Sequence, residues 1–263
     1  MKYAIMSDVH ANPAALETAL ADARAAGCKK FILLGDITGY GYDPKGALEI
    51  VRRNFDVVLM GNHDSACVEL EPEWEVRMNN NYDLDRMARE LLTEKERAWL
   101  RGRAYLHEEA GFVCTHGDFT QPNMWNYIFY KDAAEQNFLS RTEQLMVCGH
   151  THHASIWERT EKGTCRLKLA GRFRKPVMKA ESISFKLNPT SRYIVNVGSV
   201  GYPRNDLCGS YGIFDADAGR MTVRRLPFDF KSYITGMCDR NLRLPSWLCR
   251  LLLAAQAGDG ASE

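Results

Sequence analysis

The sequence contains no long apolar stretch. The longest candidate, WLCRLLLAA near the C-terminus, is interrupted by an arginine and falls far short of the ~20 apolar residues that a membrane-spanning helix needs. The apolar run before Asp8, YAIM, is too short for the core of a signal peptide. We therefore expect a chain that has no membrane partner and that resides in the cytoplasm.

Cysteine pairs with the spacing of a zinc knuckle are also absent. The chain has eight cysteines, but no two of them form a CxxC pair, which argues against a structural zinc site. Cys114 and Cys148 lie inside apolar runs that are typical of buried strands. Because the chain shows no export signal, we predict reduced, packed thiols rather than four disulfides.

The chain also lacks a large excess of positive or negative charge. The 263 residues carry a formal net charge of +1, with 45% apolar and 25% charged residues. This balance is typical of a soluble globular protein and gives no overall field that would attract a polyanion. The length allows one large α/β domain or two small ones. Since the chain has no internal repeat and no low-complexity tract, we interpret residues 1–263 as a single domain.

Five short apolar runs are each followed at once by polar residues or glycine. Runs this short and continuous are typical of strands that are buried on both faces. The segments between the first three runs have helical spacing, and Asn12 is a predicted N-cap with proline after it. Strand–helix–strand alternation predicts a parallel α/β sheet. The five runs are YAIM (3–6), FILL (31–34), VVLM (57–60), FVC (112–114) and LMVC (145–148).

The remaining segments differ from this pattern. Residues 65–104 are charged and have helical spacing, with Thr93 and Glu96 forming a predicted capping box, so we expect a helical insertion. After Ala154 the pattern becomes that of strands joined by turns. We predict hairpin turns at 162–163 and near 217–219, and a C-terminal helix at about 245–257.

Two segments allow alternative interpretations. Residues 157–192 carry ten Lys and Arg against three Glu, which indicates a solvated hairpin or, alternatively, a basic rim that attracts a polyphosphate or nucleotide. The aromatic run MWNYIFY (124–130) could stack a nucleobase, but we expect a helix that packs on the insertion.

Metal-ligating residue types follow the predicted strands, in one instance as the dense histidine cluster GHTHH. The carboxyl ends of parallel strands meet at one edge of a sheet, so these side chains are expected to converge. They offer oxygen and imidazole donors and no thiolate, which suits Mn, Fe, Ni, Zn or Co. Seven ligands are too many for one tetrahedral ion but suit two ions. The predicted ligands are Asp8, His10, Asp36, Asn62, His116, His150 and His152.

Two histidines, His107 and His153, fall outside this pattern, and we interpret them as structural residues. Glycines precede Asp36, Asn62 and His150, where they leave room for a backbone turn and for the close approach of a substrate.

The motifs SDVHAN, GDITGYG, GNHD, THGD and CGHTHH resemble the five ordered motifs of the calcineurin-like metallophosphoesterase superfamily. The match runs from Asp8 to His152 in the order of the family. The later segment NVGSVGYPRND (196–206) further resembles one found in the small prokaryotic phosphoesterases of that superfamily.

This resemblance implies an α/β fold, a four-layer αββα sandwich with two central mixed β-sheets. It also implies one metal held by Asp8, His10, Asp36 and His152, and a second held by Asp36, Asn62, His116 and His150, so that Asp36 bridges the two. Mn²⁺ and Fe are the first candidates for these ions, with Zn²⁺, Ni²⁺ or Co²⁺ as alternatives.

The second motif departs from the family pattern. Many members read GD-x-x-D-R-G where this chain reads GDITGYG (35–41), so the second aspartate and the arginine are missing. Asp64 could orient His63 in their place, or it could serve the start of the helix after the turn.

The chemistry implied is in-line attack on a phosphoester by a metal-bound hydroxide. We assign His63 as the general acid toward the leaving oxygen, because it is not needed as a ligand. Arg204 is a candidate grip for phosphate or, alternatively, a surface residue in an ion pair. Asn12 is a further candidate contact to the substrate.

Three classes of function follow. The favoured one is a hydrolase of small phosphodiesters, phosphomonoesters or nucleotide polyphosphates, including dinucleoside-tetraphosphatase and protein-phosphatase-like specificity. The second is a metal-binding scaffold without catalysis, which the complete ligand set and His63 disfavour. The third is a nuclease, which the balanced charge and the lack of an extended basic, aromatic face disfavour.

Overall fold

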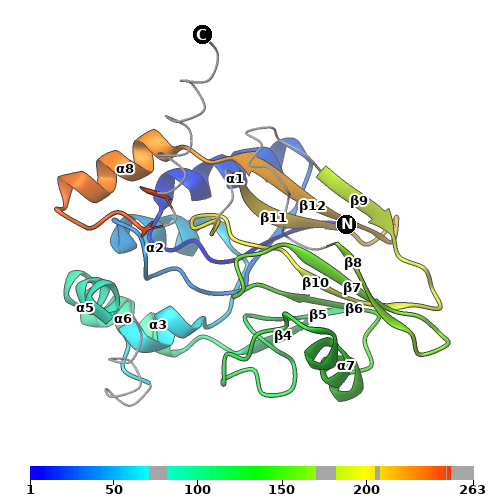
Figure 1. Ribbon diagram of the computed structural model, residues 1–263. Helices are drawn as coiled ribbons and strands as arrows, with labels where there is room; N and C mark the ends of the chain where they lie inside the picture. Colours follow the sequence, from blue (N-terminus) through cyan, green and yellow to red (C-terminus); the bar gives the residue numbers. More distant parts are fainter. Residues whose placement is uncertain (71–81, 110, 170–181, 205–207, 247, 250–263) are drawn as a thin grey trace, which may run out of the picture.

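The structure is a computed structural model that describes residues 1–70, 82–109, 111–169, 182–204, 208–246 and 248–249. Two six-stranded sheets lie face to face in these residues, and helices cover their outer faces (Figure 1). Both sheets are mixed, and the predicted parallel strands form part of each.

The first sheet has the strand order β3-β2-β1-β11-β12-β9. β1 to β3 are parallel and β11, β12 and β9 continue the sheet in antiparallel fashion. Its strands are β1 (Lys2–Met6), β2 (Lys30–Leu33), β3 (Val57–Val58), β9 (Ser182–Lys186), β11 (Cys208–Asp215) and β12 (Arg220–Pro227).

The second sheet has the strand order β4-β5-β6-β10-β7-β8. Its central strands β5, β6 and β10 are parallel. The bounds of its strands are β4 (Leu106–Glu109), β5 (Phe112–Thr115), β6 (Leu145–Cys148), β7 (Ser155–Arg159), β8 (Cys165–Leu169) and β10 (Arg192–Asn196).

The continuous apolar runs occur because both faces of the central strands are buried. In β1, Ala4 and Met6 face the outer helices, whereas Tyr3 and Ile5 face the other sheet, as the two-residue period of a strand requires. The core between the sheets thus combines side chains from both, including Phe112 of β5. This packing fixes the two sheets face to face.

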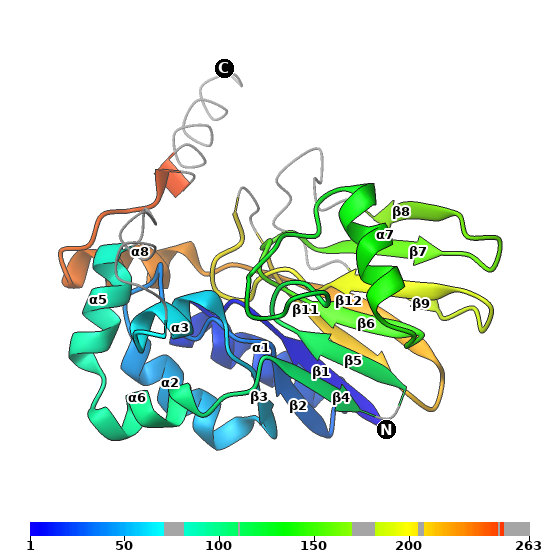
Figure 2. The same cartoon turned by 90° about the horizontal axis from the view of Figure 1, so that it is seen from below.

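The outer layers are helical. α1 (Pro13–Ala25) and α2 (Pro44–Asn54) cover the first sheet, and α7 (Lys131–Ser140) lies across β5 and β6 of the second (Figure 2). The layers are therefore helix, sheet, sheet and helix, which confirms the predicted αββα sandwich. A further helix, α8 (Phe230–Asp239), packs near the loop that carries Tyr40 and Tyr42.

In the described residues between β3 and β4 the chain forms α3 (Asn62–Cys67), α5 (Tyr82–Leu91) and α6 (Glu94–Arg101). They lie together at one end of the molecule (Figure 1). The predicted capping box is present, since Thr93 accepts from the backbone of Glu96 and Glu96 accepts from that of Thr93. Residues 71–81 of the predicted insertion are outside the described residues.

The later predictions have mixed outcomes. β7 and β8 form the predicted hairpin, as do β11 and β12. The strands predicted at 182–197 are present, but β9 and β10 belong to different sheets. Residues 170–181, in the centre of the basic segment, are outside the described residues. So is most of the predicted C-terminal helix at 245–257.

All eight cysteines lie in the described part of the chain and are free thiols, six of them buried. Within the same residues, no helix is both long enough and apolar enough to cross a membrane.

Candidate metal centre

The predicted ligands lie where strands of both sheets end. Asp8 and His10 follow β1, Asp36 follows β2, and Asn62 begins α3 directly after β3. His116 follows β5, and His150 and His152 follow β6. All of these except Asn62 are buried. Five segments that are distant in the sequence therefore meet at one site.

The backbone is strained at this site. Five of the seven predicted ligands have a positive φ, a conformation that residues with a side chain adopt rarely. Such strain persists where the surrounding structure enforces it, and it concentrates at functional sites. The residues and their φ values are Asp8 (57°), His10 (47°), Asp36 (55°), His150 (66°) and His152 (62°).

Glycine is required beside the two carboxylates. A Cβ on Gly61 would collide with the backbone and carboxylate of Asp36, and one on Gly149 would collide with Ser7 and the carboxylate of Asp8. These two glycines therefore let the loops approach the carboxylates closely, and the close approach of a substrate stays a prediction.

Each carboxylate uses one oxygen for structure. The backbone N–H of His150 donates to Oδ2 of Asp8 (3.0 Å), and the backbone N–H of His63 donates to Oδ1 of Asp36 (2.9 Å). The other oxygens, Oδ1 of Asp8 and Oδ2 of Asp36, are buried and have no hydrogen-bond partner. A buried carboxylate oxygen without a donor is costly, so these two atoms are available for a cation.

The imidazoles are oriented by backbone carbonyls. Nδ1 of His10 donates to the carbonyl of Thr38 (2.9 Å), and Nδ1 of His152 donates to that of Tyr202 (2.7 Å). Because a carbonyl can only accept, these nitrogens carry the ring protons. The Nε2 atoms of both rings therefore present lone pairs, as in histidines that bind metals.

These lone pairs face one another. Nε2 of His10 lies 3.1 Å from Nε2 of His152, and Oδ1 of Asp8 lies 3.6 and 3.3 Å from these two atoms. Burial lowers the pKa of both histidines, so the rings are neutral. Electron pairs this close repel one another, and a shared cation converts that repulsion into binding. The residues present thus fit a metal ion.

A second group adjoins the first through Asp36. Oδ2 of Asp36 lies 3.6 Å from Nε2 of His10 and 3.3 Å from Nε2 of His116. Nε2 of His116 is also 3.2 Å from the amide oxygen of Asn62. Ligand atoms of Asp36, His116 and His150 lie within 4.8 Å of one another, as do those of Asp8, His10 and His152. Asp36 therefore stands between two sets of donors.

His150 is held in the same way as the other histidines. Its Nε2 donates to the carbonyl of Trp125 (2.8 Å), which leaves Nδ1 as the acceptor. Burial and the neighbouring His116 lower the pKa of His150 to about 3, so the ring is neutral.

His63 is paired with an aspartate of α5. Its Nδ1 lies 2.8 Å from Oδ1 of Asp85, and both side chains are buried. Burial acts to lower the pKa of His63, but the carboxylates of Asp85 and Asp36 outweigh it and raise the pKa to about 9. The paired carboxylate of Asp85 thus favours the imidazolium form of His63, in which Nε2 is the second donor.

Asp64 has different contacts. Its carboxylate accepts from the backbone N–H groups of Ile37 and Thr38 (3.0 Å each) and from the hydroxyl of Thr38 (3.2 Å). It also accepts from the N–H of Gly61 at the start of α3. Of the two roles considered for Asp64, these contacts fit the one at the helix start. They hold the loop after β2 against α3.

Arg204 lies at the edge of the centre. Its Nη2 donates to the hydroxyl of Tyr40 (2.7 Å), and its guanidinium lies 5.4 Å from the centre of that ring. The Tyr40 ring in turn contacts His10 and His63, each with a ring-centre distance of 4.6 Å. Arg204 and Tyr40 therefore border the side of the centre on which His63 lies.

Asn12 is bound to the backbone at both ends of its amide. Its oxygen accepts from the N–H of Ala15 (3.2 Å), as expected for the N-cap of α1, and its Nδ2 donates to the carbonyl of Gly201 (3.1 Å). Its contact with a substrate remains a prediction.

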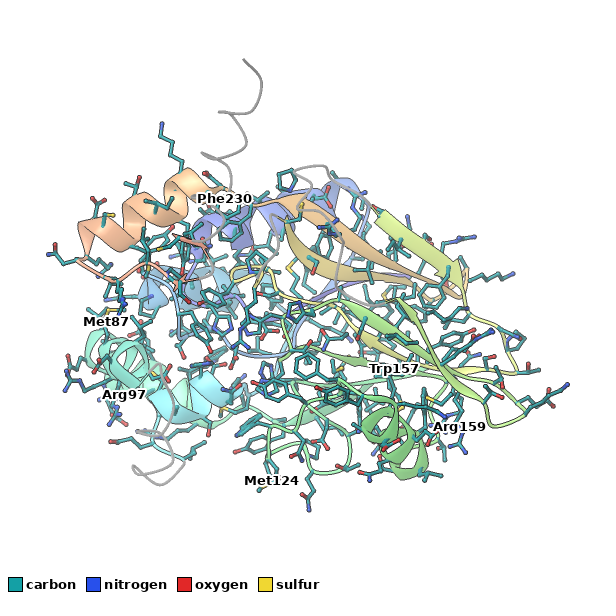
Figure 3. All side chains as sticks on the ribbon, viewed as in Figure 1. Met87, Arg97, Met124, Trp157, Arg159 and Phe230 are labelled. Carbon is teal, nitrogen blue, oxygen red and sulfur yellow. The ribbon has the colours of Figure 1, made fainter. Side chains whose placement is uncertain are left out.

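The helix expected at 124–130 is wrong, because this segment is a loop. Tyr127 stacks on His150, with ring centres 4.2 Å apart and planes 6° apart. Met124 is 59% exposed and lies at the lower edge of the molecule in Figure 3. The aromatic spacing of this run therefore arises from packing on the second sheet's histidines, not from helical periodicity.

His107 and His153 lie outside the two donor groups. Nε2 of His107 is 3.2 Å from a carboxylate oxygen of Glu109, and the backbone N–H of His153 donates to the hydroxyl of Thr151.

Sequence reasoning missed Asp85 and Tyr40. Asp85 is one of several acidic residues in a charged helix, and only its complete burial distinguishes it. Tyr40 is part of GDITGYG, where the departure from the family pattern could have drawn attention to it.

Comparisons with known proteins agree with this site. The family model described as calcineurin-like phosphoesterase superfamily domain matches residues 1–219. An uncharacterized protein of Methanocaldococcus jannaschii, MJ0912, is 27% identical over 252 residues, which cover 93% of this chain and 94% of the relative.

Two solved structures are also similar to this chain. The crystal structure of a metallophosphoesterase from Sphaerobacter thermophilus has a TM-score of 0.77 and 28% identity, covering 92% of this chain and 95% of that one. The hypothetical protein PH1004 from Pyrococcus horikoshii shares the fold, with a TM-score of 0.69, 14% identity and coverage of 95% and 97%. With a family model matched over most of its length, this chain belongs to the calcineurin-like phosphoesterase superfamily.

Proposed function

We propose that this protein hydrolyses small phosphoric esters at a centre of two metal ions. The observation that carries the proposal is the position of Asp36, whose unpartnered Oδ2 faces His10 on one side and His116 on the other. One ion would be held by Asp8, His10, Asp36 and His152, and the other by Asp36, Asn62, His116 and His150.

The donor set suits Mn²⁺ or Fe first, and Zn²⁺, Ni²⁺ or Co²⁺ as alternatives. Bound ions of this kind neutralise phosphoryl oxygens and lower the pKa of a coordinated water.

In this proposal His63 is the general acid. Asp85 occupies Nδ1 of the ring, so Nε2 is the atom that donates a proton to the leaving oxygen. Asp85 is a positioning residue, because it fixes the orientation of the ring and favours its protonated form. The leaving alcohol would thus depart without having to carry a negative charge.

Arg204 is the proposed contact to the phosphoryl group. Tyr40 uses one of its N–H groups, and a guanidinium has five donors in all, so others remain for phosphoryl oxygens. The hydrogen bond and the ring contact with Tyr40 hold the guanidinium in place before a substrate arrives, which lowers the entropy lost on binding.

The test is reconstitution of metal-free protein. We expect Mn²⁺ to restore two ions per chain, measured by mass spectrometry of the metal content, and to restore hydrolysis of p-nitrophenyl phosphate or bis-p-nitrophenyl phosphate. Protein that binds two ions but hydrolyses neither these esters nor nucleotide polyphosphates would contradict the proposal and support a scaffold without catalysis.

A further inference from the structure

A large cavity lies beside the candidate centre. Its volume is about 880 Å³, and it is lined by the start of α5 and by residues 241–246 and 249. Tyr40 and Tyr202 form its inner wall. The size falls in the range of cavities that hold organic ligands in proteins, roughly 300–1,000 Å³.

This cavity adjoins His63 through two elements. Tyr40, which lines the cavity, also contacts the His63 ring. Asp83 and Leu84 of α5 line the cavity as well, and the next residue, Asp85, holds Nδ1 of His63. The cavity and the proposed general acid therefore share both a loop and a helix.

We infer that this cavity binds the leaving group of the substrate, and that the leaving group is a nucleoside or an organic alcohol of similar size. The inference rests on the proposed function, because it takes His63 as the general acid. A general acid must lie within hydrogen-bonding reach of the leaving oxygen. The group attached to that oxygen then extends past Tyr40 into the cavity.

The lining matches this chemistry. Leu242, Leu244 and Pro245 offer an apolar surface for a ring system, and the paired rings of Tyr40 and Tyr202, 4.2 Å apart, add an aromatic wall. Arg243 and Asp83 supply a donor and an acceptor of opposite charge, which suits hydroxyl and heterocyclic nitrogen atoms. The wall thus combines apolar surface with polar groups, as a ligand that carries both a ring system and hydroxyl groups requires.

A cysteine in the wall provides a direct test. Cys249 lines the cavity and is exposed, whereas Cys238 is exposed on α8 and is not among the lining residues. We expect adenosine to slow the alkylation of Cys249 and to leave that of Cys238 unchanged. At ten times its Kd, adenosine should slow Cys249 by about tenfold, because only the free fraction reacts. Peptide mass spectrometry of the full chain distinguishes the two thiols.

A second test fills the cavity. Ser246 lines it and is exposed, so Ser246→Trp should lower kcat/KM for adenosine 5′-monophosphate by about tenfold or more through steric exclusion. The same variant should lower kcat/KM for p-nitrophenyl phosphate by a smaller factor, because the leaving group of that substrate is smaller. The control is Ser140→Trp at the exposed end of α7, which should affect neither substrate.

The outcomes separate this inference from the proposed function. Two results together would overturn the assignment of the cavity as the leaving-group site. Cys249 would be alkylated at the same rate with and without adenosine, and Ser246→Trp would keep the wild-type ratio of kcat/KM for adenosine 5′-monophosphate to that for p-nitrophenyl phosphate. These results would count against the cavity even if the wild-type protein hydrolyses phosphoesters. Protection of Cys249 in a protein that binds two ions but hydrolyses none of p-nitrophenyl phosphate, bis-p-nitrophenyl phosphate and nucleotide polyphosphates would support the cavity as a nucleoside site and refute the phosphoesterase proposal.

Discussion

The two sheets contribute different chemistry to the candidate centre. The first sheet supplies both carboxylates, Asp8 and Asp36, while the second supplies imidazoles alone, from His116, His150 and His152. Neither sheet has a complete set of donors. Among the hydrogen bonds that join the two sheets is the one from the backbone N–H of His150 to Asp8.

The two sheets therefore differ in the charge that their side chains bring to the candidate centre. The first sheet brings the negative charges that neutralise a cation, and the second brings imidazoles that complete the coordination. A bound ion would therefore join the two layers, so that its affinity and the stability of the sandwich are linked.

The largest effect is expected from Asp36, the residue that faces both donor groups. Asp36→Ala should lose both ions and lower kcat by at least ~10⁴-fold, since each ion supplies several kcal/mol of charge stabilisation. His150→Ala, from the second sheet, faces one group only and should lose one ion. The metal content per chain measures the loss of ions in both variants. Two ions bound to Asp36→Ala would contradict the role of Asp36 as a ligand shared by the two donor groups.

The next effect concerns His63 of α3 and Asp85 of α5, two side chains that would contribute acid chemistry rather than ligands. His63→Gln should lower kcat by ~10²–10⁴-fold with an unchanged metal content. Asp85→Asn should lose less, and its loss should be greater for phenyl phosphate than for p-nitrophenyl phosphate, because nitrophenolate leaves without a proton. An equal loss for both substrates would indicate that Asp85 serves the fold rather than the orientation of His63.

Removal of metal should lower the thermal stability. An ion present at 1,000 times its Kd stabilises the native state by about 4 kcal/mol, which corresponds to a decrease in Tm of roughly 10 °C when a chelator removes it. Calorimetry with and without EDTA measures the decrease. It should be smaller in His150→Ala, and an equal decrease in that variant would mean that the second sheet does not take part in binding.

The smallest effect is expected on the outer face of the first sheet. Burial acts to raise the pKa of Asp22, but hydrogen bonds from Arg224 and Tyr211 outweigh it and lower the pKa. Because the folded pKa lies below the ordinary value of 3.8, this stabilisation is present above pH ~3.8 and is lost as the pH falls through the folded pKa.

Asp22→Asn should therefore cost about 1 kcal/mol at pH 7, a value reduced for solvent screening, and progressively less as the pH falls through the folded pKa of Asp22. Urea unfolding at pH 7 and at successively lower pH values measures the change. Tyr211→Phe, which keeps the ring, should show a smaller loss, and a cost of Asp22→Asn that does not vary with pH would exclude the charge as its origin.

The gathering of the donors could be predicted from the sequence because it follows from one rule. Residues such as Asp8, Asp36 and His150 each come directly after an apolar run, and parallel strands end at a common edge. The contribution of Asp85 could not be predicted in this way. It lies in a charged helix whose pattern contains no information about which acidic side chain turns inward.

Sheet membership was a second limit. β9 and β10 are close in the sequence, yet they pair in different sheets. Strand patterning identifies which face of a strand is buried, but partner choice depends on the long-range packing that builds the core between the sheets. The helix predicted at 124–130 was wrong for a similar reason. Tyr127 packs on His150, which belongs to another segment, and local spacing does not indicate such a long-range contact.

The pairing of Asp85 with His63 has a consequence for the modular view of this molecule. α5 lies outside the strand–helix–strand scaffold of the first sheet. The carboxylate of its Asp85 nevertheless contacts the buried His63 ring, which lies beside the candidate ligands. Shortening or exchanging this helix would thus alter proton transfer while every metal donor stayed in place. Chains that keep the same motifs but differ in this helix need not share the same chemistry.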